Sequence, residues 1–172
     1  MDRIRNLGVT DELPPVAADR FAGSSDFDAF CRAETAWARR LSFVMTGDRQ
    51  SADDIAQEGF ARVCGQFTRL ENPRAYLRVV IVNLSRRHRR TAGRQSPLSD
   101  ADDVAALAVS PESIEVLDLI DRLPSRQRAV LVLRYYEGMS EIEIASVLSC
   151  RPGTVKSLAS RALRRLRKEL EA

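Results

Sequence analysis

The sequence of 172 residues has few of the features that mark membrane, secreted or metal-binding proteins. Its apolar runs are all shorter than the ~20 residues that a membrane-spanning helix needs, so no membrane insertion is expected. The first residues, Met1–Asn6, lack the apolar core of a secretory signal. Cys31, Cys64 and Cys150 are odd in number and far apart, which favours reduced thiols over disulfides or a zinc site. These absences predict a cytoplasmic protein.

Residues that build enzyme active sites are also scarce. The sequence has a single histidine, His88, and no His/Cys spacing that would hold a metal. It has neither a glycine-rich phosphate loop nor the motif of a catalytic nucleophile. We therefore expect no catalytic residue, no metal and no cofactor. His88 is expected to pack or to contact phosphate, and Trp37 is expected in the core. An enzyme acting on nucleic acids is disfavoured.

Charge is unevenly distributed along the chain, although the net charge is only +3. One basic cluster lies within residues 86–94, a second within 161–168, and Ser99–Asp103 between them is acidic. Two basic clusters separated by an acidic segment indicate two nucleic-acid-binding surfaces joined by a hinge. The alternative for either cluster is a solvated helix face that binds nothing.

The C-terminal part of the chain has the pattern of a helix-turn-helix. A short amphipathic stretch at 140–148 precedes a tight turn and a longer basic stretch at 153–170. Ser140 and Glu143 have the spacing of a capping box, which starts a helix. Pro152 suits the first turn of the second helix, where a missing N–H is tolerated. The pattern predicts a DNA-binding element.

The two faces of the second helix differ in character. At about 100° per residue, an apolar line should pack on the preceding helices, formed by Val155, Ala159, Ala162 and Leu166. The opposite side carries hydroxyl and basic side chains, namely Ser157, Ser160, Arg161, Arg164 and Lys168, with Lys156 flanking. Such a face suits base edges and phosphates in a major groove. The alternative is an amphipathic surface helix whose charges only face water.

Helix-breaking residues and hydrophobic periodicity predict an all-α fold of two small helical bundles joined by a flexible linker. The second bundle contains the helix-turn-helix. The predicted parts are a flexible N-terminal arm (1–25), a first bundle (26–92), an acidic linker (93–112) and a second bundle (113–172). The predicted helices before the helix-turn-helix are Phe27–Thr46, Ser51 toward Gly65, Arg74–Arg90, Ser110–Leu123 and Ser125–Glu137.

The predicted helix at 74–90 also has two faces. A core stripe contains Leu77, Val80, Ile81, Leu84 and His88. The other side contains Tyr76, Val79, Asn83, Arg86 and Arg90. Apart from the valine, it combines an aromatic ring, an amide and two arginines. This second set fits a platform for single-stranded nucleic acid. A buried helix with a basic tail is the open alternative. Asp53 and Asp54 lie near the start of the preceding helix. The helix dipole favours acidic residues there, so their presence does not by itself indicate a binding role.

Four ordered segments resemble a bacterial sigma factor of the extracytoplasmic-function group. The segments are Ala52–Glu58, Asn72–Leu77 continuing to Val82–Arg87, Leu123–Leu131, and Gly153–Ser157 with Ser160–Ala162. The resemblance extends over roughly Asp26–Leu170. Each motif alone is moderately specific, whereas the ordered set is very specific. The resemblance implies a subunit for transcription initiation, with core RNA polymerase and promoter DNA as partners and an anti-sigma factor as a possible third.

The resemblance also implies roles for particular residues. Asp54, Gln57 and Glu58 match a set that docks region 2 on a coiled coil of the polymerase β′ subunit. Asn83 and the loop Gly65–Asn72 match capture of the −10 element. The full set expected there is Tyr76, Asn83, Arg86, Arg87 and Arg90. Region 4 is implied to face the β flap with residues around Arg128–Tyr136. It is implied to read the −35 element with Thr154, Lys156, Ser157, Ser160, Arg161 and Arg164.

A stand-alone transcription regulator is the rival interpretation, because such regulators share a similar helix beginning Gly153–Lys156. It leaves residues 26–92 unexplained. A regulator of this kind would bind its operator as a dimer without polymerase. The two-bundle interpretation instead uses a linker of ~20 residues, which spans up to roughly 70 Å when extended, to engage two DNA elements at once.

Overall fold

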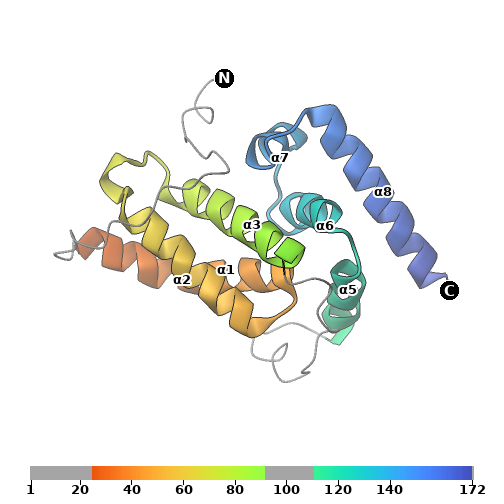
Figure 1. Cartoon of the computed structure of the whole chain (residues 1–172), viewed down its shortest axis with the longest axis horizontal. Helices are drawn as coiled ribbons and strands as arrows, with labels where there is room; N and C mark the ends of the chain where they lie inside the picture. The colour runs from red at the N-terminus through yellow and green to blue at the C-terminus, as the bar shows by residue number, and fades with distance from the viewer. Residues whose placement is uncertain (1–24, 92–110, 172) are drawn as a thin grey trace.

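The computed structural model describes residues 25–91 and 111–171, and every regular element in these two ranges is helical. The first bundle contains α1 (Ser25–Thr46), α2 (Arg49–Cys64), the short turn η2 (Phe67–Arg69) and α3 (Pro73–Thr91). The second contains α5 (Pro111–Asp121), α6 (Ser125–Leu131), η3 (Val132–Tyr136), α7 (Glu141–Val147) and α8 (Pro152–Leu170) (Figure 1). The predicted all-α class is confirmed. The predicted N-terminal arm and linker lie almost entirely outside the described residues.

The start of α2 differs from the prediction. The helix begins at Arg49, and its N-cap is Asp48, whose carboxylate accepts a hydrogen bond from the Ser51 N–H at 2.7 Å. Gly47 precedes this cap with φ +79, a left-handed conformation that glycine adopts without strain. An aspartate directly after a chain-reversing glycine caps the helix before Ser51 can do so. The predicted start at Ser51 was therefore wrong by about half a turn.

The predicted single helix at 125–137 is interrupted. Helix α6 ends at Leu131, and the next residues form a π-helical turn, η3, in which the Glu137 N–H donates to the Val132 carbonyl at 3.0 Å. A π turn holds one more residue than an α turn, so it rotates the side chains that follow it. The turn ends at Glu137, whose carboxylate reaches the first bundle.

Two local predictions at the helix-turn-helix are confirmed. Ser140 and Glu143 form a capping box, in which the Ser140 N–H donates to the Glu143 carboxylate at 2.8 Å. In return, the Glu143 N–H donates to the Ser140 hydroxyl oxygen at 3.3 Å. These hydrogen bonds to Ser140 hold the pKa of Glu143 below its ordinary value. Pro152 is the first residue of α8, as predicted.

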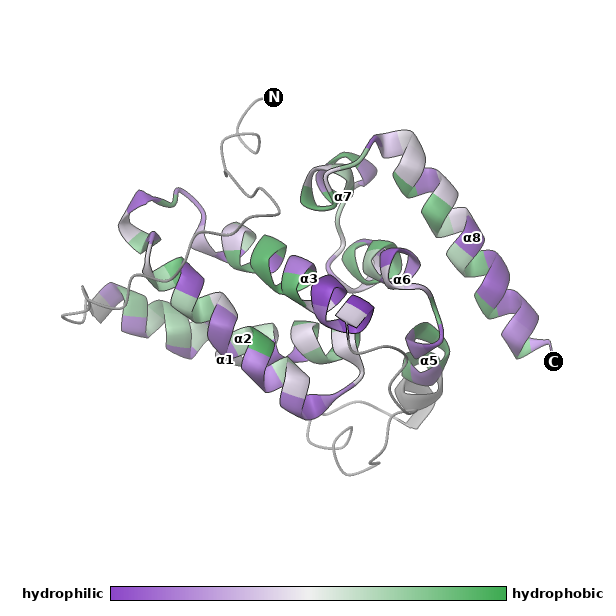
Figure 2. Cartoon of the chain, viewed as in Figure 1, coloured by the Kyte–Doolittle hydropathy of each residue, from purple (hydrophilic) through white to green (hydrophobic). Residues whose placement is uncertain are grey.

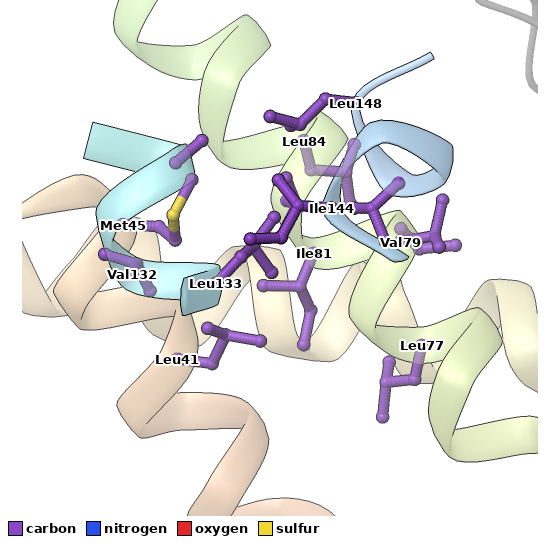
Figure 3. Packing of buried hydrophobic residues seen from close by; sticks show 14 of the residues in the cluster. Leu41, Met45, Leu77, Val79, Ile81, Leu84, Val132, Leu133, Ile144 and Leu148 are labelled. Atoms are coloured by element: carbon purple, nitrogen blue, oxygen red, sulfur yellow. The ribbon is translucent and has the colours of Figure 1, made fainter. Parts of the chain in front are cut away.

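One apolar core joins the two bundles, with α3 between them. Leu41 and Met45 of α1 lie near Val132 of the second bundle, and Leu133 and Ile144 lie among the side chains of α3 (Figure 3). Val79 and Val82, outside the predicted stripe of α3, are buried as well. Because α3 is apolar on more than one side, it packs on α1 and α2 and also on α6. The predicted hinged pair of bundles is thus packed into one body.

The capping box yields a prediction for stability. Ser140→Ala removes the hydroxyl that satisfies the Glu143 N–H, and it should lower the free energy of unfolding by about 1 kcal/mol in urea titrations. Ser146→Ala, an exposed position on the same helix, is the control and should cost much less. The loss should shrink in acid, because the lowered pKa of Glu143 contributes stability only while that carboxylate is ionised. Equal losses in both variants would contradict the cap.

Candidate nucleic-acid interface

Helix α8 separates its apolar and polar side chains as predicted. Val155, Ala159 and Ala162 are buried, while Leu166 is half-buried and packs on Leu123 and Leu131. The predicted contact residues lie away from this core, with Lys156, Ser157, Ser160, Arg161 and Arg164 exposed and Thr154 partly buried. Figure 2 shows hydrophilic residues dominating the C-terminal part of α8. Lys156 also pairs with Glu141 of α7 at 3.7 Å. An exposed basic helix face of this kind has the dimensions and charge for a DNA major groove.

The turn between α7 and α8 is tight, and nearby residues provide partners for its backbone hydrogen-bonding groups. Ser149 has φ +49, and the Cys150 N–H donates to the Ala145 carbonyl at 2.9 Å, which closes the end of α7. Arg151 is then extended, and α8 begins at once with Pro152. The Ser157 hydroxyl donates to the Thr154 carbonyl at 3.0 Å, so it is oriented along the first turn of α8. The helix-turn-helix therefore presents the start of α8 outward.

An open groove of about 390 Å³ runs beside α8, and its walls come from α8, η3 and α7. Basic side chains dominate its rim, with Arg134, Lys156, Arg164 and Arg167 among its lining residues. Apolar side chains also contribute, since Tyr135 is 63% exposed and Leu163 is 42% exposed. Sequence periodicity did not single out Tyr135 or Leu163. Tyr135 lies in the π turn η3, which local spacing does not predict.

The predicted single-strand platform on α3 is only partly exposed. Tyr76 is 3% exposed, and its hydroxyl oxygen accepts from the Gln66 side-chain amide at 3.2 Å, so its predicted exposure as a stacking ring was wrong. The ring is buried because the apolar surface of α3 is wider than one stripe. Asn83 and Arg86 are partly buried, whereas Arg87 and Arg90 are exposed. These four side chains lie on one side of α3.

An acidic and amide set lies on the exposed face of α2. Asp54, Gln57 and Glu58 are exposed, and their spacing of three and four residues places them side by side. Glu58 also pairs with Arg62 one turn later. Asp53 pairs with Arg39 of α1 at 2.6 Å and is thereby separated from this set. The arrangement is a compact negative surface that a basic partner surface would complement.

Contacts between the bundles involve residues whose partners the sequence did not indicate. Trp37 is buried, as predicted, but its indole N–H donates to Glu137 of the second bundle at 2.8 Å. Arg128 was expected to face outward, and it is instead fully buried beside Asp121. Arg89, part of the predicted basic cluster, also binds Asp121. Long-range partners of this kind have no signature in local spacing.

The described residues give no sign of other kinds of site. Within 25–91 and 111–171, no cluster of His, Cys, Asp or Glu side chains has the make-up of a metal site. None of the helices in the same ranges is long and apolar enough to cross a membrane.

Comparison with known families identifies both bundles. A family model described as Sigma-70 region 2 matches residues 19–95, and one described as Sigma-70, region 4 matches residues 113–166. An RNA polymerase sigma-E factor from Streptomyces coelicolor is 34% identical, over 86% of this chain and 87% of its own. The ECF RNA polymerase sigma factor SigM from Mycobacterium tuberculosis is 33% identical, over 88% of this chain and 78% of its own.

A solved structure has the same fold. The sigma factor RpoE in complex with the anti-sigma factor NepR from Bartonella quintana superposes with a TM-score of 0.68 at 23% identity. The match covers 87% of this chain and 99% of that one.

The two helical regions match the two sigma-70 family models, so the chain is a sigma factor. The chain belongs to the sigma-70 family, within its extracytoplasmic-function group. Members of this family are regulatory subunits that give RNA polymerase its promoter-specific initiation, and this chain has both regions required.

The exposed face of α8 makes a prediction for promoter choice. Arg161→Ala removes a guanidinium from that face, and it should weaken recognition of the −35 element by about tenfold in holoenzyme binding to promoter duplexes. Arg40→Ala, which removes an equal charge from an exposed site on α1, should leave −35 preference unchanged. If Arg161→Ala binds every −35 variant as the parent chain does, this face does not read the element.

Proposed function

We propose that the chain acts as an initiation subunit rather than a catalyst, with promoter reading and polymerase docking divided among α8, α3 and α2. The observation that supports this most strongly is the exposed polar face of α8, opposite a buried apolar line. A helix that only covered a core would need no ordered set of hydroxyl and basic side chains. The proposed place of action is the cytoplasm, where bacterial polymerase and chromosome meet.

Region 4 is proposed to read the −35 element as duplex DNA. Thr154, Lys156 and Ser157 lie in the first turns of α8, where a recognition helix contacts base edges. Ser160, Arg161 and Arg164 continue the same exposed side toward the C-terminus. Arginine and lysine favour guanine edges and phosphates, whereas serine and threonine hydroxyls contact either kind of group. The groove between α8 and η3 lies alongside and extends the basic surface.

Region 2 is proposed to capture the opened −10 strand on α3 and the loop before it. Arg86 Nη1 lies 3.5 Å from the Asn83 carboxamide oxygen, which keeps these two side chains together. An amide can recognise the edge of an unstacked base, and neighbouring arginines can hold its phosphates. Arg87 and Arg90 are exposed for that purpose. Tyr76 is left out of this proposal because it is buried.

Polymerase docking is proposed on α2 and on the end of η3. The exposed set Asp54, Gln57 and Glu58 would meet the coiled coil of the β′ subunit. For the β flap, the proposal now rests on the exposed Tyr135 and Tyr136 rather than on Arg128. Aromatic side chains of this kind suit a protein interface, since they bury a large area with little loss of side-chain entropy.

An anti-sigma partner is a further part of the proposal. It is supported by the fold shared with a sigma factor that was solved bound to one. The exposed Tyr135 and Ile142, each 63% exposed, offer an apolar surface on region 4 for such a partner.

The acidic set on α2 makes a prediction for polymerase binding. Asp54→Arg reverses a charge at its centre, and it should weaken association with core polymerase about tenfold or more. Asp28→Arg, the same reversal at an exposed site on α1, should have little effect. Association measured by fluorescence anisotropy with labelled sigma factor would test this. Undiminished binding of the Asp54 variant would remove α2 from the interface.

Asn83 makes a separate prediction for strand opening. Asn83→Ala should leave core binding intact, since the side chain lies on α3 and away from the α2 set. It should slow open-complex formation about tenfold, measured by permanganate reactivity of −10 thymines, because a base-capturing amide is lost. Normal opening by the variant would show that another residue captures the strand. Transcription reconstituted from core polymerase, promoter DNA and this chain also distinguishes a sigma factor from a stand-alone regulator. A regulator would bind its operator without polymerase.

A further inference from the structure

Glu141, the first residue of α7, lies between two cationic side chains at the groove beside α8. Arg134 Nη1 donates to Glu141 Oε1 at 3.1 Å, and Lys156 Nζ lies 3.7 Å from Glu141 Oε2. Arg134 comes from η3, and Lys156 comes from the second turn of α8, which packs beside α7 (Figure 1). Three elements of region 4 therefore meet at one carboxylate. We name Arg134, Glu141 and Lys156 the Glu141 cluster.

A carboxylate is unexpected on a surface proposed to bind DNA. Among the described residues that line the groove, Glu141 is the only acid, and four of the others are basic. Phosphate binding gains affinity from such basic groups and loses affinity to a carboxylate beside them. The helix dipole of α7 favours an acid in its first turn, but Glu143 already lies in that turn and completes the capping box. The pairing of Glu141 with two cations of the groove therefore indicates a further role.

The two cations of the Glu141 cluster are held to different degrees. The Lys156 side chain is 71% exposed, and exposed ion pairs are weak and screened by salt, so DNA can draw this ammonium away from Glu141. Arg134 is 38% exposed and has a second contact, because its guanidinium carbon lies 5.9 Å from the centre of the Tyr135 ring. Lys156 is therefore the member of the cluster that DNA can most easily release.

A contact from Lys156 to DNA has to replace its pair with Glu141. On a matched sequence the ammonium reaches a base edge, such as the acceptors of guanine, and that contact compensates for the lost pair. On unmatched DNA the ammonium gains only a phosphate contact, while the Glu141 carboxylate is left close to other phosphates. A binding site discriminates better when an unfavourable group penalises the wrong partner more than the right one. A carboxylate beside Lys156 has this effect.

We propose that Glu141 is a specificity-determining residue for recognition of the −35 element. Its carboxylate holds Lys156 back from phosphates, so α8 binds tightly only where the base sequence compensates for the release of that lysine. Glu141 is thus a positioning residue, which acts through Lys156 and needs no DNA contact of its own. The inference rests on the proposed function, which assigns Lys156 to the −35 element.

The test uses holoenzyme assembled from core polymerase and the full chain, with two promoter duplexes. One carries a −35 sequence that the parent holoenzyme selects from a randomised library, and in the other that element is scrambled. Polymerase contacts elsewhere are common to both duplexes and cancel in the ratio of the two affinities. Glu141→Gln removes the charge at nearly constant side-chain size. The matched control is Glu169→Gln on α8, because Glu169 pairs with Arg122 at 3.1 Å and neither residue lines the groove.

Glu141→Gln should bind the scrambled duplex about three- to tenfold more tightly than the parent, the effect of one added phosphate contact at ordinary salt. Binding to the selected duplex should change much less, so the ratio of the two affinities should fall by about the same factor. On the scrambled duplex, the plot of log affinity against log salt should steepen by about one, because Lys156 then neutralises one more phosphate. Glu169→Gln should keep the ratio of the parent.

An unchanged ratio in Glu141→Gln would overturn the proposal, and so would weaker binding to both duplexes, because damage to α7 lowers affinity where the proposal predicts a gain. In a chain that already carries Lys156→Gln, adding Glu141→Gln should have little further effect, and an undiminished effect would exclude action through Lys156. A parent holoenzyme with no preference for any −35 sequence would instead refute the proposed function. The salt dependence on arbitrary duplex DNA would then still decide whether Glu141 restrains Lys156.

Discussion

The structure depends on the burial of α3 on more than one side. Helices α1 and α2 cover one side, and the second region covers another through α6 and its neighbours. The apolar surface of α3 is wider than region 2 alone can cover, so the rest must be buried by another element or remain in water. Burial is favoured by about 25 cal/mol per Å² of apolar area. The contacts of Glu137 and Asp121 then select one orientation between the regions, because charged hydrogen bonds are directional where apolar packing is not.

This single constraint also decides which faces of the helices are exposed. The helix proposed to capture an opened strand is also the helix on which region 4 packs, so α3 has two competing uses. The exposed face of α8 and the acidic face of α2 are free in the packed arrangement, whereas parts of α3 and η3 are not. Access to partners is thus unequal across the molecule. A partner can reach α2 or α8 directly, whereas it can reach only part of α3.

Sequence reasoning succeeded where the determinants are local. The capping box at Ser140, the proline that begins α8 and the two faces of α8 each follow from residues within one or two helical turns. It failed where the determinant is a distant partner. Tyr76 lies on the predicted polar side of α3, yet it is buried. The partners of Glu137 lie 100 and 59 residues away, so no spacing rule reveals them. Roles for residues on α2 and α3 came from resemblance and remain proposals.

The most direct test of this account is the distance between the two regions in the free chain, before and after the fold is lost. Fluorophores attached at Arg40 of α1 and Arg165 of α8, both exposed, would report it by energy transfer. The account predicts high transfer efficiency in the free folded chain and a large fall when urea unfolds it. Low efficiency in the free folded chain would contradict it, because regions that share one apolar core must lie close together.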